Sequence, residues 1–585
     1  MEQPGPYDRI HSHLAALYGE AQAAPLLEQL RVRLERFARE YPQLGQAPPP
    51  AERLTEDDVV LITYGDQVAA PGEPPLRTLG DTLRTLFRDV AGAVHILPFY
   101  PFTSDDGFSV VDYTAVDPQL GDWEDVALLG RRYRLMFDAV VNHISASSAW
   151  FQAFLRGEPG AEARFITLPA DTDVSLVTRP RTHPLLTRFD TPAGPRYVWT
   201  TFSTDQIDLN FANPDVLLAI VDVLLLYAAR GAALIRLDAI GYLWKQIGTH
   251  SIHLEQAHRV VKLFRAALDI AAPGVLLITE TNVPHVDNIS YFGDGSDEAQ
   301  LVYQFPLAPL VLHSFRSGSA HALSDWAADL QPPSDRTGFF NFLASHDGIG
   351  VVPASGILSP DDVAALVERT LQHGGRVSYK SNPDGSQSPY ELNITLFDAL
   401  SDPAAVDPHA VDRFAAAHAI VLALQGVPGI YVHSLIGSHN NHAGLAETGR
   451  ARTINREKWR REELAARLAD SDSHEAAVFA RMERLIRARR AEPAFHPASP
   501  QRVLTAGDSV FALLRGAPER GEVVVCVHNV SDVPQTLALD GFALGLPPGA
   551  RLRDLLGGPG ATVDVHAVLS LTLAPYQTLW LRPSA

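Results

Sequence analysis

Eight short apolar segments, several of them rich in β-branched residues, recur along this chain and are separated by stretches with helical spacing. The intervening stretches include 214–231 and 254–268, which are typical of amphipathic helices. Apolar strands that alternate with helices pair in parallel, with both faces of the sheet covered. Eight such strands predict an α/β fold, a closed (β/α)8 barrel of the TIM-barrel type. The expected strands lie within 59–65, 93–99, 134–143, 233–239, 275–281, 301–307, 339–347 and 427–435.

The segments that depart from the strand–helix alternation predict additional subdomains. Residues 144–210 and 353–400 are too long for loops in a compact domain, so we expect two inserted subdomains. From residue 498 the pattern changes to alternating strands, which predicts a C-terminal β-sandwich. The expected layout is a helical N-terminal segment (1–55), a barrel in three parts (56–143, 211–352 and 401–497), inserts at 144–210 and 353–400, and a β-sandwich at 498–585.

The net charge and the apolar run lengths of the chain limit the kinds of binding partner that we expect. The chain has 585 residues and a formal net charge of −20, which repels nucleic-acid phosphates and anionic lipid. We therefore expect no nucleic-acid or membrane partner. The first residues lack the features of a signal peptide, and no apolar run reaches about 18 residues, which favours a cytoplasmic location. Both a monomer and a homodimer remain open.

Polar side chains follow four of the expected strands at the edge where barrel enzymes carry their active sites. One carboxylate in such a place is often only the N-cap of the next helix, but several in barrel order indicate a site. The residues are Asp138, Asn142 and His143 after the third strand, Arg236, Asp238 and Tyr242 at the fourth, Glu280 at the fifth, and His346 and Asp347 at the seventh, with Asp105, Asp106 and Phe108 after the second.

Three carboxylates at one barrel mouth suit glycosidic chemistry, which needs a nucleophile and a protonated acid. Asp238 fits the nucleophile, because Arg236 lies on the same face of the strand and favours the ionised carboxylate. Glu280 follows an apolar run, where burial and neighbouring carboxylates should raise its pKa toward that of a working acid. Asp347 is expected to stabilise the transition state.

These segments resemble a known family. FDAVVNH, IRLDA, ITE and ASHD, in this order, resemble the four signature regions of the α-amylase superfamily, over roughly residues 55–585. VHILPFYPFTSDDGF, GRARTINR and SHDGIG are similar to the sucrose phosphorylase group. TRPRTHPLLTRF, SYKSNPDGSQSPYELN and ETNVPHVDNISYFG are closer still to its glucosylglycerate phosphorylase branch.

The resemblance implies a retaining glucoside phosphorylase that converts 2-O-α-glucosyl-glycerate and inorganic phosphate into α-glucose 1-phosphate and glycerate. Within the group, sucrose 6′-phosphate, sucrose and glucosylglycerol are alternative substrates, and hydrolysis or transglucosylation are alternative reactions. A catalytically silent sugar-binding protein is the alternative outside enzymes, and it is disfavoured because all three carboxylates are present.

The resemblance also implies residue roles around the glucosyl unit and its acceptor. The implied glucose contacts are Asp105, Phe108, His143, Phe202, Gln206, Arg236, Tyr242, His346 and Arg452. Arg181 and Tyr390 match phosphate-contacting residues, and Arg179, His183, Asn282, Lys380 and Glu391 complete the phosphate or acceptor candidates. Asn282 and Glu391 stand where sucrose phosphorylases carry His and Gln. We expect Glu391 to bind hydroxyls or to orient a neighbouring cation.

One position bears on metal binding. The residue that matches Asn142 is a calcium ligand in calcium-dependent amylases, and Asp138 lies near it in sequence. Calcium takes 6–8 oxygen ligands, and the first insert offers no carboxylate cluster that clearly supplies them. Sucrose phosphorylases work without a metal, so the expectation is no metal and no cofactor, with phosphate as co-substrate.

Overall fold

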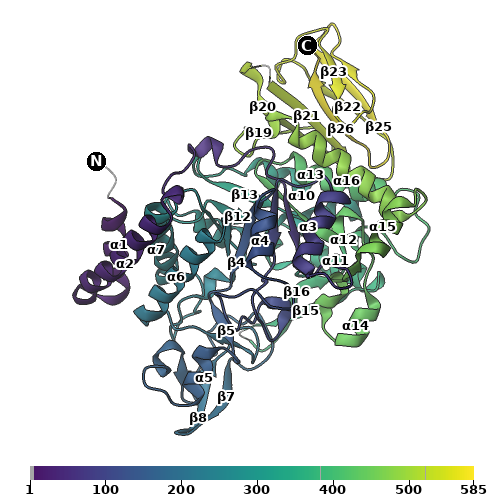
Figure 1. The fold of residues 1–585 in the computed structure, drawn as a ribbon. Coiled ribbons are helices and arrows are strands. Elements are labelled where there is room, and N and C mark those ends of the chain that lie inside the picture. The colour runs from purple at the N-terminus through teal and green to yellow at the C-terminus, as the bar shows by residue number, and fades with distance from the viewer. Residues whose placement is uncertain (1–4, 383, 521, 585) are drawn as a thin grey trace.

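A closed barrel of parallel strands forms the centre of the protein (Figure 1). The computed structural model describes residues 5–382, 384–520 and 522–584. Going round the barrel, the strands are β1 (Val60–Thr63), β17 (Val427–Tyr431), β13 (Gly338–Asn341), β12 (Leu301–Tyr303), β11 (Leu276–Thr279), β10 (Ala232–Leu237), β4 (Arg134–Ala139) and β3 (Ala93–Ile96). Each lies in or overlaps one expected segment, so the predicted barrel is confirmed.

The strands are buried on both faces, which explains their continuous apolar sequences. Residues of β1 and β11 are all buried, and the first strand pairs with both β3 and β17, so the last strand closes the ring. The surrounding layer contains α3 (Pro75–Thr85), α4 (Trp123–Gly130), α6 (Pro214–Ala229), α7 (Glu255–Ala271), α9 (Leu307–Ser317) and α13 (Ala410–Ala423). Several strands are shorter than their apolar runs, because the last residues of each run turn into the loops that carry the site.

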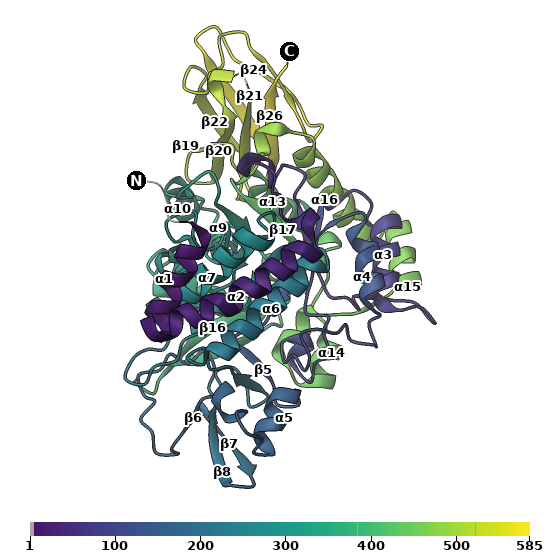
Figure 2. The same cartoon turned by 60° about the vertical axis from the view of Figure 1, so that its left-hand side comes forward.

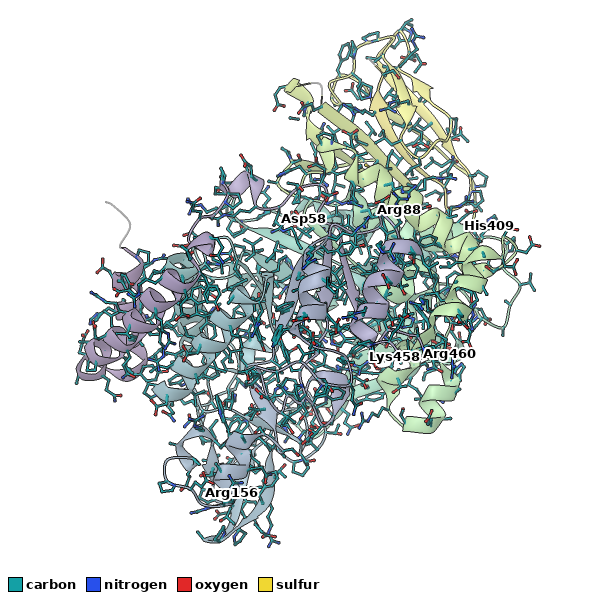
Figure 3. All side chains as sticks on the ribbon, viewed as in Figure 1. Asp58, Arg88, Arg156, His409, Lys458 and Arg460 are labelled. Carbon is teal, nitrogen blue, oxygen red and sulfur yellow. The ribbon has the colours of Figure 1, made fainter. Side chains whose placement is uncertain are left out.

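The direction of the strands separates two ends of the molecule. Asp58 lies just before β1, on the side of the C-terminal sheets, whereas Arg156 lies in the inserted segment at the opposite end (Figure 3). The carboxyl ends of the strands therefore face the inserted segment. This is the end where the sequence places its polar side chains.

Residues 144–210 and 353–400 carry small antiparallel sheets of their own. The first contains α5 (Ala149–Leu155), the sheet β6–β8–β7 (Thr167–Leu168, Gly194–Trp199 and Leu186–Thr191) and β9 (Gln206–Asp208), which pairs with β5 (His143–Ser145). The second contains α11 (Pro360–Gln372) and the hairpin of β15 (Arg376–Ser381) and β16 (Gln387–Asn393), which pairs with β14 (Ile349–Gly350). All three small sheets lie beside the carboxyl end of the barrel (Figure 1).

Two N-terminal helices pack as a hairpin on the outside of the barrel. They are α1 (Pro6–Tyr18) and α2 (Glu20–Glu40), and Gly19 between them has φ 86°, a conformation that favours glycine. Arg9 reaches Asp269 of α7 at 2.8 Å, and α2 lies along α6 (Figure 2). The packing of α2 on α6 explains why α6 is apolar around most of its circumference, since the hairpin covers a face that solvent would otherwise reach.

The C-terminal residues form two antiparallel sheets with a separate apolar core. One has six strands in the order β19 (Gln501–Leu504), β20 (Val510–Ala517), β21 (Glu522–Asn529), β26 (Thr578–Pro583), β23 (Arg551–Asp554) and β24 (Ala561–Thr562), and the other pairs β22 (Gln535–Asp540) with β25 (Val568–Leu573). Side chains from both sheets share one core. Within the described ranges, no helix has the length and apolar character needed to cross a bilayer.

Candidate active site

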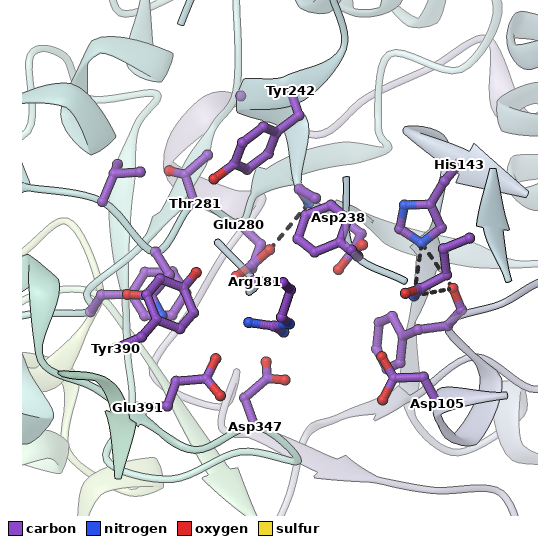
Figure 4. Close-up of a pocket in the computed structure, with 18 of the residues that line it drawn as sticks. Asp105, His143, Arg181, Asp238, Tyr242, Glu280, Thr281, Asp347, Tyr390 and Glu391 are labelled. Carbon is purple, nitrogen blue, oxygen red and sulfur yellow. Dashed lines mark hydrogen bonds between the residues drawn. The ribbon is translucent and has the colours of Figure 1, made fainter. Parts of the chain in front are cut away.

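A pocket at the carboxyl end of the barrel gathers all three expected catalytic carboxylates (Figure 4). Asp238 follows β10, Glu280 follows β11 and Asp347 lies in the loop after β13. The pocket is lined by Asp105, Phe108, His143, Arg181, Phe202, Gln206, Asp238, Ala239, Gly241, Tyr242, Ile252, Glu280, Thr281, Asn282, Val283, Phe305, His346, Asp347, Tyr390, Glu391 and Arg452. One concave site therefore joins residues from the barrel and from both inserted segments.

Asp238 is held by a buried guanidinium beneath the pocket. Arg236 donates to Asp238 Oδ1 at 2.8 Å and also to Asp138, whose other oxygen lies 2.6 Å from His95 Nε2. Burial raises the pKa of Asp238 above its ordinary value, and Arg236 opposes that rise. The ion pair favours the ionised carboxylate that a nucleophile requires.

Glu280 has the environment of a protonated acid. Burial, followed by the negative charges of Asp238 and Asp347, raises its pKa to about 8, against the partial opposition of Arg236. The rise expected from its position after an apolar strand is therefore present. Its Oε2 accepts the backbone N–H of Ala239 at 3.1 Å, and Ala239 has φ 50°, an uncommon conformation for a residue with a side chain. This backbone contact orients the carboxyl group.

Asp347 lies in the opposite electrostatic environment. Burial alone would raise its pKa, but the Arg452 guanidinium, 2.6 Å away, acts together with other nearby positive groups, Arg236 and Arg456 among them, and the pKa of Asp347 is held well below its usual range. Arg452 is in turn held by Glu391, whose two oxygens accept from it at 2.6 and 3.2 Å. Glu391 was expected either to bind hydroxyls or to orient a neighbouring cation, and its contact with Arg452 fits the second role.

The side chains expected around glucose form one wall of the pocket. Gln206 Nε2 and His143 Nε2 both lie within hydrogen-bonding distance of the Phe108 carbonyl, at 3.1 and 2.9 Å. The Phe108 ring stacks on His346 with 4.6 Å between ring centroids. Burial lowers the pKa of His346 well below its ordinary value, which favours the neutral imidazole. Phe202 lies edge-on to Tyr242, with centroids 5.4 Å apart.

The two acidic residues after β3 are positioned by an arginine that the sequence reasoning did not select. Arg456 Nη1 lies 2.5 Å from Asp106 and 3.7 Å from Asp105, and its Nε donates to the His346 carbonyl at 2.8 Å. Both aspartates have positive φ, which Arg456 helps to hold. The motif GRARTINR contains Arg456, but sequence spacing gave no sign of which arginine would reach this loop.

The acceptor side contains four of the seven residues expected there. Arg181, Asn282, Tyr390 and Glu391 line the pocket. The Arg181 guanidinium lies 5.5 Å from the Tyr390 ring and 5.9 Å from the Phe202 ring. The three remaining candidates, Arg179, His183 and Lys380, do not line the pocket. The backbone of Arg179 forms a β-bridge with Ser381, and His183 Nε2 lies 3.1 Å from the Thr200 carbonyl. Lys380 lies in β15.

A lysine lies between the oxygens of Asn142 and Asp208, at the junction of the barrel and the first insert. Lys245 Nζ donates to Asn142 Oδ1 at 2.7 Å and lies 2.9 Å from Asp208 Oδ2, and its side chain is 3% exposed. The ammonium group thus places a positive charge beside Asn142, the residue that matches a calcium ligand of calcium-dependent amylases. Over the described residues, no group of three or more His, Cys, Asp or Glu is arranged to hold a metal.

We predict that Lys245→Met lowers the free energy of unfolding by roughly 3–5 kcal/mol, because it leaves the fully buried Asp208 carboxylate without its cation. Thermal or denaturant unfolding would measure the loss. Adding Asp208→Asn in the same chain removes the uncompensated charge and should recover part of the stability. A single variant as stable as the parent would show that the buried pair contributes nothing.

Several neighbours of the carboxylates were not among the expected site residues. They are Ala239, Gly241, Ile252, Thr281, Val283 and Phe305 in the pocket wall, and His95, Lys245, Tyr303 and Arg456 behind it. Thr281 and Val283 flank Asn282 directly after Glu280, so position after a strand could have indicated them. Most of the others depend on contacts between distant segments.

Comparison with known proteins agrees with this architecture. Residues 89–351 match the alpha amylase catalytic domain. The chain is 52% identical to a glucosylglycerate phosphorylase of Allomeiothermus silvanus, over 98% of each chain. It is 32% identical to a sucrose phosphorylase of Agrobacterium vitis, over 75% of this chain and 89% of that protein.

A solved structure shares the fold. The crystal structure of sucrose 6F-phosphate phosphorylase from Thermoanaerobacter thermosaccharolyticum matches with a TM-score of 0.71 at 26% identity, over 81% of this chain and 94% of that chain. The near-complete coverage and the identity to the first relative place the whole chain, and not only its barrel, in this family. The chain belongs to the α-amylase family, in the group of the glucosylglycerate and sucrose phosphorylases.

Proposed function

We propose that the protein is a retaining glucoside phosphorylase that converts 2-O-α-glucosyl-glycerate and phosphate into α-glucose 1-phosphate and glycerate. The relative that is 52% identical over almost its full length is a glucosylglycerate phosphorylase, which supports the substrate. The observation that carries the reaction is the contrast between Glu280, with a pKa raised to about 8, and an arginine-held Asp238 in one pocket. This pair supplies the acid and the nucleophile of a double displacement.

In the first half-reaction, Asp238 attacks the anomeric carbon of the glucosyl unit. Glu280 donates its proton to the bridging oxygen, so glycerate leaves as an alcohol, and a covalent glucosyl-enzyme forms on Asp238. Arg452 keeps Asp347 ionised, so that this carboxylate stabilises the positive charge that develops on the sugar.

In the second half-reaction, a phosphate oxygen attacks the anomeric carbon and the bond to Asp238 breaks. Glu280, now ionised, accepts a proton from the incoming phosphate, and α-glucose 1-phosphate leaves. The chemistry consists of proton transfer and displacement at carbon. We infer that it requires no metal and no organic cofactor, with phosphate as the only co-substrate.

The reverse reaction tests this proposal. The protein is incubated with α-glucose 1-phosphate and, separately, with D-glycerate, glycerol, fructose or fructose 6-phosphate, and phosphate release is followed. We expect strong release with glycerate alone. Release with fructose 6-phosphate instead would transfer the function to sucrose 6′-phosphate. Glucose formed from the donor without any acceptor would identify a hydrolase, and a true phosphorylase releases little glucose from its glucoside when phosphate is omitted.

We predict that kcat/KM for the glucoside declines as the pH rises above about 8. Glu280 must carry its proton in the first half-reaction, and its pKa, raised from 4.5 to about 8, keeps that proton at neutral pH. Above pH 8 the protonated fraction falls about tenfold per pH unit. In a double displacement kcat/KM for the first substrate does not depend on phosphate, so the titration of phosphate does not distort this profile. A plateau extending to pH 10 would contradict Glu280 as the acid.

A further inference from the structure

We propose that the Arg181 guanidinium binds two anions in turn, the glycerate carboxylate in the first half-reaction and inorganic phosphate in the second. This inference rests on the proposed function. It makes Arg181 the residue that selects an anionic acceptor over a neutral one, a role that goes beyond contact with phosphate.

The stereochemistry of a retaining displacement requires both anions to occupy one place. Glycerate leaves from the face of the anomeric carbon opposite Asp238, and phosphate must arrive on that same face. Both exchange a proton with Glu280, so both lie within reach of the same carboxyl group. A cation that serves one anion at this position is therefore available to the other.

The charges that line the pocket leave Arg181 unneutralised. Arg452 is engaged by Asp347 and Glu391, each at 2.6 Å. Arg236 lies beneath the pocket and is engaged by Asp238. Arg181, by contrast, donates to its neighbouring carbonyl of Pro180 at 3.1 Å and forms no ion pair with any residue that the structure describes. An anion that enters the pocket finds its positive partner here.

The surroundings of Arg181 suit a small oxyanion. The rings of Tyr390 and Phe202, whose centroids lie 5.5 and 5.9 Å from the guanidinium carbon, form apolar walls beside it. In Figure 4 the Arg181 side chain is drawn among Glu280, Tyr390, Glu391 and Asp347, which line the same pocket. The planar fork of a guanidinium matches both carboxylate and phosphate oxygens. Glu391 does not cancel this attraction, since Arg452 already neutralises it.

Two nearby cations offer matched controls. Arg179 is two residues from Arg181 in the same loop, but its backbone bridges to Ser381. Lys380 stands opposite Ser388 in the β15–β16 hairpin. Neither side chain lines the pocket. Arg179→Gln and Lys380→Gln therefore remove a charge of the same sign from the same region without touching the acceptor.

A partition experiment isolates the acceptor step. α-Glucosyl fluoride loads the enzyme: the bond from the anomeric carbon to fluorine breaks, fluoride leaves, and Asp238 is glucosylated. D-glycerate and glycerol, which differ by a carboxylate in place of a hydroxymethyl group, then compete for this intermediate. The acceptor hydroxyl attacks, its proton passes to Glu280, and Asp238 is released. The ratio of glucosylglycerate to glucosylglycerol depends only on the acceptor, because both products come from the same intermediate.

We expect Arg181→Gln to lower this product ratio roughly ten- to hundredfold, the range for loss of a charge-assisted pair. The ratio of glucose 1-phosphate to glucosylglycerol, measured with phosphate in place of glycerate, should fall in parallel. Arg181→Lys, which keeps the charge but not the fork, should give intermediate ratios. The two control variants should keep the wild-type ratios.

The outcomes separate the inference from the proposed function. If the wild-type enzyme makes glucosylglycerate and Arg181→Gln keeps its preference for glycerate, the shared site is wrong while the function stands. A fall in the phosphate ratio alone would also overturn it, as would a loss of preference in Arg179→Gln or Lys380→Gln. If the wild-type enzyme makes glucosylglycerol but no glucosylglycerate, the proposed function fails and the inference fails with it.

Discussion

Asp238→Asn should reduce turnover of the glucoside by roughly four to six orders of magnitude, the scale on which removal of a nucleophile acts. An amide in place of the carboxylate cannot form the glucosyl-enzyme. The substitution keeps the shape of the side chain, and Arg236 retains its pairing with Asp138, so the fold should persist. Initial rates of phosphate-dependent glucose 1-phosphate formation measure the loss, and circular dichroism with thermal unfolding verifies the fold.

Asp222→Asn is a suitable control for this variant. Asp222 lies on α6, where it pairs with Arg33 of α2 at 3.2 Å, and it does not line the pocket. The control should keep wild-type turnover. If Asp238→Asn turned over at a rate near that of the parent, Asp238 would not be the nucleophile.

Glu280→Gln should show a loss that depends on the leaving group. Glycerate needs a proton to leave, so its glucoside should react roughly 10²–10⁴-fold more slowly, the usual contribution of general acid catalysis. Fluoride leaves without a proton, so loading of the enzyme from α-glucosyl fluoride should stay close to the wild-type rate. Glutamine keeps an oxygen that can accept the Ala239 N–H, which preserves the local backbone.

The pre-steady-state release of fluoride and the steady-state cleavage of the glucoside measure these two rates separately. The decline of kcat/KM above pH 8 should also disappear in Glu280→Gln, because the group that titrates is gone. Equal losses with both donors would assign Glu280 to binding or packing, and a persistent alkaline decline would assign the titration to another group.

The barrel could be predicted because its signal is local and repeated. The apolar residues of β1 and β11 lie next to one another in sequence, and burial on both faces removes the alternation that marks other strands. The catalytic carboxylates were predictable for the same reason: Asp238 and Glu280 each directly follow a recognisable strand, and barrel topology brings all such ends to one mouth.

Contacts between distant segments could not be predicted in this way. Lys245 lies 103 positions from Asn142, and Arg456 lies 350 positions from Asp106, so no local pattern connects them. The directions of side chains in the loop at 178–184 could not be predicted either. Arg179 and Arg181 are equivalent in sequence pattern, so that pattern does not distinguish them. The family resemblance singled out Arg181, and the fold places Arg181, but not Arg179, in the pocket wall. Side-chain direction in an irregular loop depends on what packs against it.

The N-terminal hairpin has a consequence for the synthesis of the protein on the ribosome. Its apolar side chains, Leu26, Leu30, Leu34 and Phe37, are buried in the finished protein, but their partners on α6 and α7 end at residues 229 and 271. The ribosome adds about 5–20 residues per second, so roughly ten to fifty seconds pass between synthesis of the hairpin and synthesis of the helices that cover it. Two isolated helices of this length are marginal in water. The nascent chain therefore presents an unprotected apolar hairpin to chaperones before most of the barrel has been translated.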